Sequence, residues 1–182
     1  MLRKYTILLV IMASAGLICI DAFAAEITLP ITGHALISNG SGPARILINV
    51  PLPQEVNDSN LVFAELTFPI TPQLACDSIL RIDCYPVTSA WTPQNVGWSS
   101  PWQNAGGDYD TSAAPILFAA SESSTQQAYF DLTRVIISWL RNTRQNHGLI
   151  FMIPTQNLSR FALRTAPNLP TNAIGVLKIV VL

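Results

Sequence analysis

Short apolar runs separated by turn-forming residues constrain the fold of this 182-residue chain most. Proline-rich breaks interrupt the chain at residues 51–53, 69–72 and 167–170. We expect strands over residues 45–50, 61–68, 79–87, 116–119, 127–130, 149–153, 160–164 and 175–182. Short strands at a spacing of about ten residues predict a mainly β fold, an antiparallel jelly-roll-like β-sandwich.

The run over residues 61–68 shows how such a strand would meet the core. Alternate residues of a strand point to opposite faces of the sheet. One face of this run is wholly apolar, and it consists of Val62, Ala64, Leu66 and Phe68. We expect this face to point inward.

One segment breaks the strand pattern and predicts a short α-helix over about residues 131–143. Its apolar residues recur at helical spacing: Leu132, Val135, Ile136, Trp139 and Leu140. Asp131 is suited to cap the free amides of the first turn. Arg141 and Arg144 suit the negative end of the helix dipole. We expect residues 146–148 to end the helix and lead into the next strand.

The first residues indicate export. Arg3 and Lys4 precede a mostly apolar run over residues 6–20, and residues 22–24 are suited to a signal peptidase. We therefore expect a signal peptide over residues 1–24, a single domain over residues 25–182, and a secreted, extracellular protein. The alternative is an uncleaved anchor, but the apolar run is shorter than the roughly 20 residues that span a membrane.

Two cysteines remain after residue 24, at positions 76 and 84. An oxidising compartment favours a disulfide between Cys76 and Cys84. A metal site is the alternative, although two thiolates with no histidine nearby make a poor zinc site.

The low charge of the chain excludes some partners. Only 12% of the residues are charged, and the net charge is −1, whereas about 25% is typical. Such a chain offers no basic surface for nucleic acid.

Three of the four tryptophans lie close together, at positions 91, 98 and 102. Crowded tryptophans mark either a core or an aromatic binding surface. Trp91 lies at the end of a predicted strand and Trp98 begins a segment after a short turn, and we assign both to the core. Trp102 lies in a polar loop, and we assign it and Tyr109 as candidates for stacking on a sugar ring.

Other polar residues suggest further candidate sites. Asp108 and Asp110 follow two glycines and form a candidate calcium site, with a solvated glycine turn as the alternative. Arg160 and Arg164 share a face of a predicted strand and are candidates for binding a glycan. The chain has no nucleophile elbow, zinc-protease motif or phosphate-binding loop, so we expect no enzymatic activity.

Several landmarks converge in one order along the chain. They are Ala64-x-Leu66, Val87-Thr-x-x-Trp91, Val96-x-Trp98, Gly107-Asp108, Phe130-Asp131-Leu132-Thr133, Asn146-His147-Gly148-Leu149 and Phe161-Ala162-Leu163-Arg164. This order resembles the DNRLRE domain, also called carbohydrate-binding module family 96, over about residues 30–182. The resemblance implies a secreted β-sandwich that binds acidic or neutral polysaccharide. The chain departs from the family at Thr165, where a carboxylate is common.

These observations support three hypotheses. The first is a secreted, non-catalytic β-sandwich that binds polysaccharide at or outside the cell surface. The second is a structural or adhesive module with a protein partner, because hydrophobic residues make up 49% of the chain. The third is a hydrolase or lyase, which would require converging carboxylates.

Overall fold

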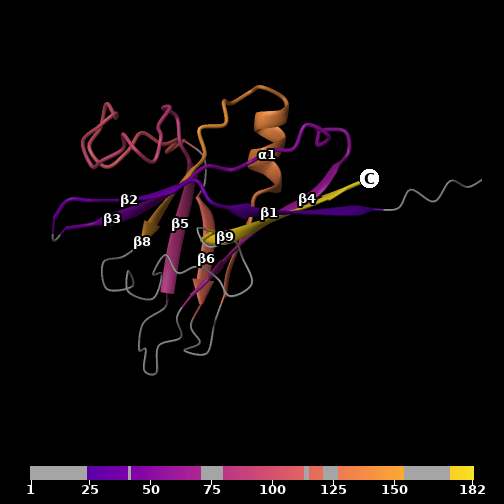
Figure 1. Ribbon diagram of the computed structural model, residues 1–182, viewed down its shortest axis with the longest axis horizontal. Coiled ribbons are helices and arrows are strands. Elements are labelled where there is room, and N and C mark those ends of the chain that lie inside the picture. Colours follow the sequence, from indigo (N-terminus) through magenta and orange to yellow (C-terminus); the bar gives the residue numbers. More distant parts are fainter. Residues whose placement is uncertain (1–23, 41, 71–79, 113–114, 121–126, 154–172) are drawn as a thin grey trace, which may run out of the picture.

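The protein, described here from a computed structural model, folds as two antiparallel sheets and one helix (Figure 1). The structure describes residues 24–40, 42–70, 80–112, 115–120, 127–153 and 173–182. The mainly β architecture confirms the predicted antiparallel β-sandwich with one short helix. In the described part of the chain, no helix has the length and apolar character needed to cross a membrane.

The strands of each sheet come from distant parts of the sequence. The four-stranded sheet has the order β1 (Ala25–Ile31), β9 (Gly175–Val181), β4 (Leu61–Pro69) and β7 (Gln127–Asp131). The five-stranded sheet has the order β2 (His34–Ser38), β3 (Ala44–Ile48), β8 (Leu149–Ile153), β5 (Leu80–Pro86) and β6 (Ile116–Ala120). The strands β1 and β2 were not predicted. The strand predicted over residues 160–164 lies outside the described residues.

The main core fills the space between the two sheets. Phe68 from β4, Phe130 from β7 and Phe151 from β8 lie at its centre and are almost completely buried. The rings of Phe130 and Phe151 meet edge to face at 5.1 Å between centroids. Such contacts add about 0.5–1.5 kcal/mol to the stabilisation from burial.

The prediction for the apolar face of β4 is right at three positions and wrong at one. Ala64, Leu66 and Phe68 are buried, whereas Val62 is 48% exposed. The register between β4 and β9 shifts between Leu61 and Phe63, so Val62 is the extra residue of a β-bulge. A bulge interrupts strict alternation, and Val62 consequently leaves the inward-facing row.

The helix α1 (Thr133–Leu140) is shorter than predicted and differs at both ends. Asp131 does accept a hydrogen bond from the Thr133 amide at 2.9 Å, but the residue at the cap position is Leu132. The helix ends before Asn142, which has a φ of 55°. Asparagine tolerates this left-handed conformation, so Asn142 ends the helix rather than residues 146–148.

The predicted Cys76–Cys84 disulfide is not supported. Cys84 is a free thiol in β5 that points into the main core and has no exposed surface. Its burial raises the pKa of the thiol well above the usual value. Cys76 lies outside the described residues. The inward direction of Cys84 follows from strand alternation, which also buries Ile82.

Candidate functional site

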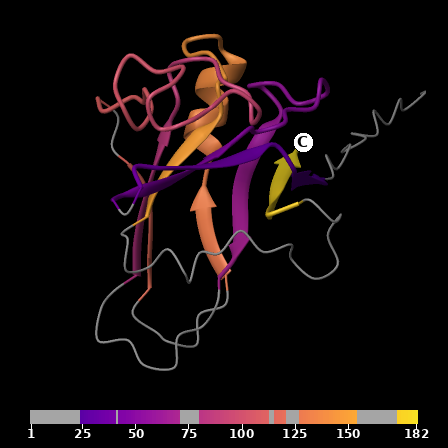
Figure 2. The ribbon, with the colours of Figure 1, turned by 60° about the vertical axis from the view of Figure 1, so that its left-hand side comes forward.

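A second, smaller apolar cluster lies on the outer face of the five-stranded sheet. Leu47 and Ile150 alternate with the core-facing residues of β3 and β8 and therefore point away from the main core, and Ile37 from the edge strand β2 packs with them. Residues 87–112, which follow β5 and are called the covering loop below, pack on them. Figures 1 and 2 show this loop and α1 at the same end of the sandwich.

Buried tryptophans attach the covering loop to the sheet. Trp91 and Trp102 are 8% and 7% exposed, and their indole N–H groups donate to the carbonyl oxygens of His147 and Gly97. Trp91 is therefore in a core, as predicted. The assignment of Trp102 as a sugar-stacking residue is not supported, because its ring is covered by protein. The polar residues around Trp102 did not indicate this second cluster.

Arg45 holds the middle of the covering loop. Its guanidinium lies 5.1 Å from the ring centre of Trp98 and 5.4 Å from that of Tyr109, and it donates to the Gly106 carbonyl oxygen. A Cβ atom on Gly106 would lie only 2.7 Å from this guanidinium, and the φ of Gly106 is +92°. Only glycine fits both conditions, so this glycine serves close packing on Arg45.

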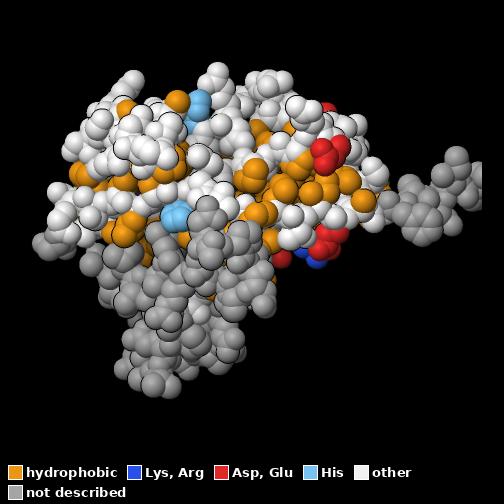
Figure 3. Space-filling view, in the orientation of Figure 1, with side chains coloured by type: hydrophobic (Ala, Val, Ile, Leu, Met, Phe, Trp, Pro, Cys, Tyr) orange, Lys and Arg blue, Asp and Glu red, His pale blue; other side chains and the backbone are white. Residues whose placement is uncertain are grey.

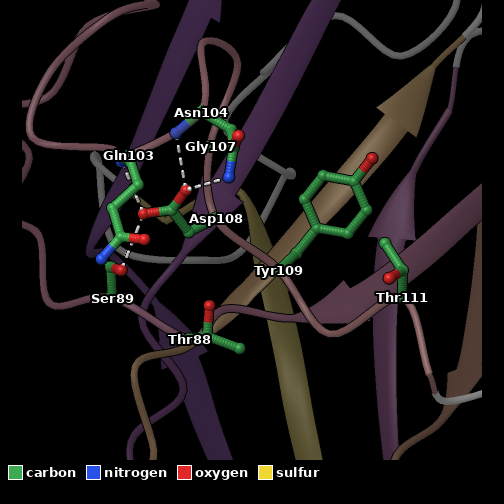
Figure 4. Close-up of a pocket in the computed structure, with 8 residues that line it drawn as sticks. All are labelled: Thr88, Ser89, Gln103, Asn104, Gly107, Asp108, Tyr109 and Thr111. Atoms are coloured by element: carbon green, nitrogen blue, oxygen red, sulfur yellow. Dashed lines mark hydrogen bonds between the residues drawn. The ribbon is translucent and has the colours of Figure 1, made fainter.

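Asp108 organises the covering loop from within. Its Oδ2 accepts hydrogen bonds from the Ser89 hydroxyl and the Gln103 backbone amide, both at 2.8 Å. Its Oδ1 accepts from the backbone amide and side chain of Asn104, at 2.9 and 3.3 Å (Figure 4). Burial raises the pKa of the Asp108 carboxyl, but these hydrogen bonds outweigh burial and hold the pKa below its usual value.

The candidate calcium site at Asp108 and Asp110 is not supported by this geometry. Both oxygens of Asp108 already accept from protein donors. Asp110 pairs with Arg144 at 2.6 Å and accepts from the amide and hydroxyl of Ser112. Among the described residues, no group of three or more histidine, cysteine or acidic side chains is placed to hold a metal. The two carboxylates therefore stabilise the loop.

A polar hollow of about 430 Å³ opens beside Asp108, and we call it the central hollow. Its lining residues are Thr88, Ser89, Gln103, Asn104, Gly107, Asp108, Tyr109 and Thr111. The volume lies within the range of about 300–1,000 Å³ typical of ligand sites. In Figure 4, Ser89 and Gln103 gather on one side of Asp108, and the Tyr109 ring stands on the other.

The rim of the central hollow carries polar groups that are free to bind a ligand. Thr88, Gln103 and Thr111 are exposed, and their side chains have no hydrogen-bond partner among the described residues. Hydroxyl and amide groups both donate and accept hydrogen bonds, as the hydroxyls of a sugar do. These three residues were not predicted, because isolated threonine and glutamine side chains are common in loops.

Tyr109 is the predicted sugar-stacking residue that the structure places in the hollow. It is partly buried, and its ring packs at a tilt against Tyr85, with 5.2 Å between centroids. This contact and the Arg45 guanidinium fix the ring while part of it remains accessible. The other predicted glycan-binding residues, Arg160 and Arg164, lie outside the described residues.

One face of the described surface shows few charges. Figure 3 shows a face on which the charged side chains gather toward β1, and most of the remaining described surface is hydrophobic or neutral. No protein-family model and no curated protein sequence matches the chain.

Proposed function

We propose that this protein is a secreted, non-catalytic β-sandwich module that binds polysaccharide at or outside the cell surface through the central hollow. The observation that carries this proposal is the combination of one fixed aromatic ring, Tyr109, with the unpaired polar side chains of Thr88, Gln103 and Thr111. The ring provides an apolar surface for the C–H face of a sugar, and the polar groups meet its hydroxyls.

The rigidity of the hollow supports binding of a flexible polymer. The carboxylate of Asp108 holds the loop backbone at Gln103 and Asn104, and buried tryptophans fix the loop on the sheet. A preformed site loses little conformational entropy when the ligand binds. The same hydrogen bonds occupy the two oxygens of Asp108, which favours a structural role over general acid or base catalysis.

The resemblance to the DNRLRE domain supports this proposal, and the signal-like residues 1–24 are the reason for proposing a secreted protein. The competing hypothesis of a protein partner predicts a different behaviour. A module that binds a protein through an apolar surface would form stable complexes or oligomers and would ignore polysaccharides.

Affinity electrophoresis in gels that contain single purified polysaccharides tests the proposal. We expect retardation by at least one polysaccharide, loss of retardation in Tyr109→Ala, and normal retardation in Tyr129→Ala. Tyr129 is the matched control because it is an exposed tyrosine on β7, in the other sheet. A stable oligomer in size-exclusion chromatography, with no retardation in any gel, would favour the protein-partner hypothesis instead.

A further inference from the structure

The central hollow is not an isolated cavity, because residues of its wall also line hollows on two sides. Tyr109 also lines a hollow of about 390 Å³, the sheet-face hollow, together with Arg45, Arg81 and Asp83. Thr88 also lines a hollow of about 220 Å³, the bridging hollow, together with Asp110 and Arg144. The central hollow therefore lies between two neighbours.

The series of adjoining hollows, called the row below, continues from the bridging hollow to the helix α1. Pro86 and Arg144 line both the bridging hollow and a hollow of about 440 Å³, the helix-side hollow. Asp131, at the end of β7, and Arg134, in the first turn of α1, also line the helix-side hollow. Four hollows with shared walls thus run from the outer face of the five-stranded sheet to α1.

The charges along this row balance. The four hollows are lined by four arginines and four aspartates, which are Arg45, Arg81, Arg134, Arg144, Asp83, Asp108, Asp110 and Asp131. Two direct ion pairs join Arg81 to Asp83 and Arg144 to Asp110. A surface with compensated charges gives no net attraction to a polyanion.

We infer that the row binds an internal segment of an uncharged polysaccharide, an inference that rests on the proposed function. One sugar unit would lie in the central hollow and its neighbours along the polymer in the adjoining hollows. A site for a chain end would need a closed wall on one side of the central hollow. Here, both sides lead into further hollows. The affinity should therefore grow with the length of the ligand until the row is filled.

A length series of oligosaccharides tests this inference by isothermal titration calorimetry. The probes are cello-, manno-, xylo- and laminari-oligosaccharides of one to six units, with oligogalacturonates as the charged counterpart. We expect the hexamer of one neutral series to bind at least about tenfold more tightly than its monomer, which corresponds to 1.4 kcal/mol or more. Its affinity should change less than about twofold when the salt concentration is raised, because a neutral ligand forms no screened ion pairs.

A variant at the far end of the row separates the subsites. Arg134 is exposed and has no ion-pair partner among the described residues, so Arg134→Ala should leave the fold intact. We expect this variant to lower the affinity for the hexamer and to leave the dimer unaffected. Arg141→Ala is the matched control, since Arg141 follows the same helix but pairs with Asp58 and lines none of the four hollows.

The possible failures are distinguishable. Equal affinity for the monomer and the hexamer would overturn the inference of an internal segment, while leaving the proposed function in place. Tighter, salt-sensitive binding of oligogalacturonates would overturn the inference of an uncharged ligand. Loss of hexamer binding in Arg141→Ala but not in Arg134→Ala would overturn the assignment of the row. Absence of binding to every oligosaccharide and every polysaccharide would refute the proposed function as well.

Discussion

Replacement of Asp108 by asparagine should loosen the covering loop. The side chain keeps nearly the same volume, but one hydrogen-bond acceptor, a carboxylate oxygen, becomes a donor, an amide nitrogen. Each carboxylate oxygen accepts from one backbone amide, Oδ2 from Gln103 and Oδ1 from Asn104. In the Asp108→Asn variant, one of these oxygens becomes an amide nitrogen. Whichever way the new side chain is turned, one backbone N–H then faces another donor.

The size of the effect follows from these contacts. A buried N–H group without a partner costs about 1–3 kcal/mol, and the low end of that range, about 1 kcal/mol, applies here because these hydrogen bonds are only partly buried and Gln103 and Asn104 are exposed residues. The remaining hydrogen bonds lose the contribution of the charge, which amounts to roughly 1 kcal/mol for this network. We therefore expect Asp108→Asn to lower the free energy of unfolding by about 2 kcal/mol.

Urea unfolding followed by tryptophan fluorescence measures this loss, because Trp91, Trp98 and Trp102 all lie in the covering loop. Asp58→Asn is the matched control, since Asp58 forms an exposed ion pair with Arg141. Exposed pairs contribute about 1 kcal/mol or less. If Asp108→Asn destabilises the protein no more than Asp58→Asn does, the proposed role of Asp108 is wrong.

Four further predictions follow from burial and titration. Phe130→Ala should lower the free energy of unfolding by about 3–5 kcal/mol in urea, through the cavity left in the main core. Trp102→Ala should destabilise the protein by a similar amount, about 3–5 kcal/mol; a loss of binding with unchanged stability would show that its ring faces a ligand. Iodoacetamide should leave Cys84 unmodified in the native protein and alkylate it in urea without reductant, as peptide mapping would show; an unmodified Cys84 in urea would point to a disulfide. The pKa of the Asp108 carboxyl is lower in the folded protein than in the unfolded chain, where it is about 3.9. The ionised carboxylate therefore stabilises the fold above this pH, and the stabilisation is lost as the pH falls through the folded pKa. Urea midpoints should consequently decline less steeply below about pH 4 in Asp108→Asn than in the wild type.

Local patterns were sufficient to predict most of the sandwich. The apolar alternation in residues 61–68 identified β4, because a strand with one buried face must repeat every two residues. The bulge at Val62 could not be predicted, since it depends on the register with β9, a strand more than a hundred residues away. The helix was predicted from its apolar stripe, while its end depended on the left-handed conformation of Asn142.

The site was harder to predict than the fold. β1 was missed although Ile27, Leu29 and Ile31 alternate in the sequence and pack against the main core, and β2 is a short edge strand whose Leu36 is 51% exposed. Trp102 was assigned to a binding surface because its polar neighbours concealed the apolar cluster beneath the covering loop. Thr88 and Gln103 belong to the site only through the folded loop, and no spacing in the sequence brings them together.

The most direct test of the proposed function is calorimetric titration of the polysaccharide that most retards the protein. The titration compares the wild type with Gln103→Ala and with Gln54→Ala, an exposed glutamine that lines none of the four hollows. We predict at least about tenfold weaker binding for Gln103→Ala, or 1.4 kcal/mol, and unchanged binding for Gln54→Ala. Equal affinities for all three proteins would show that the central hollow is not the binding site.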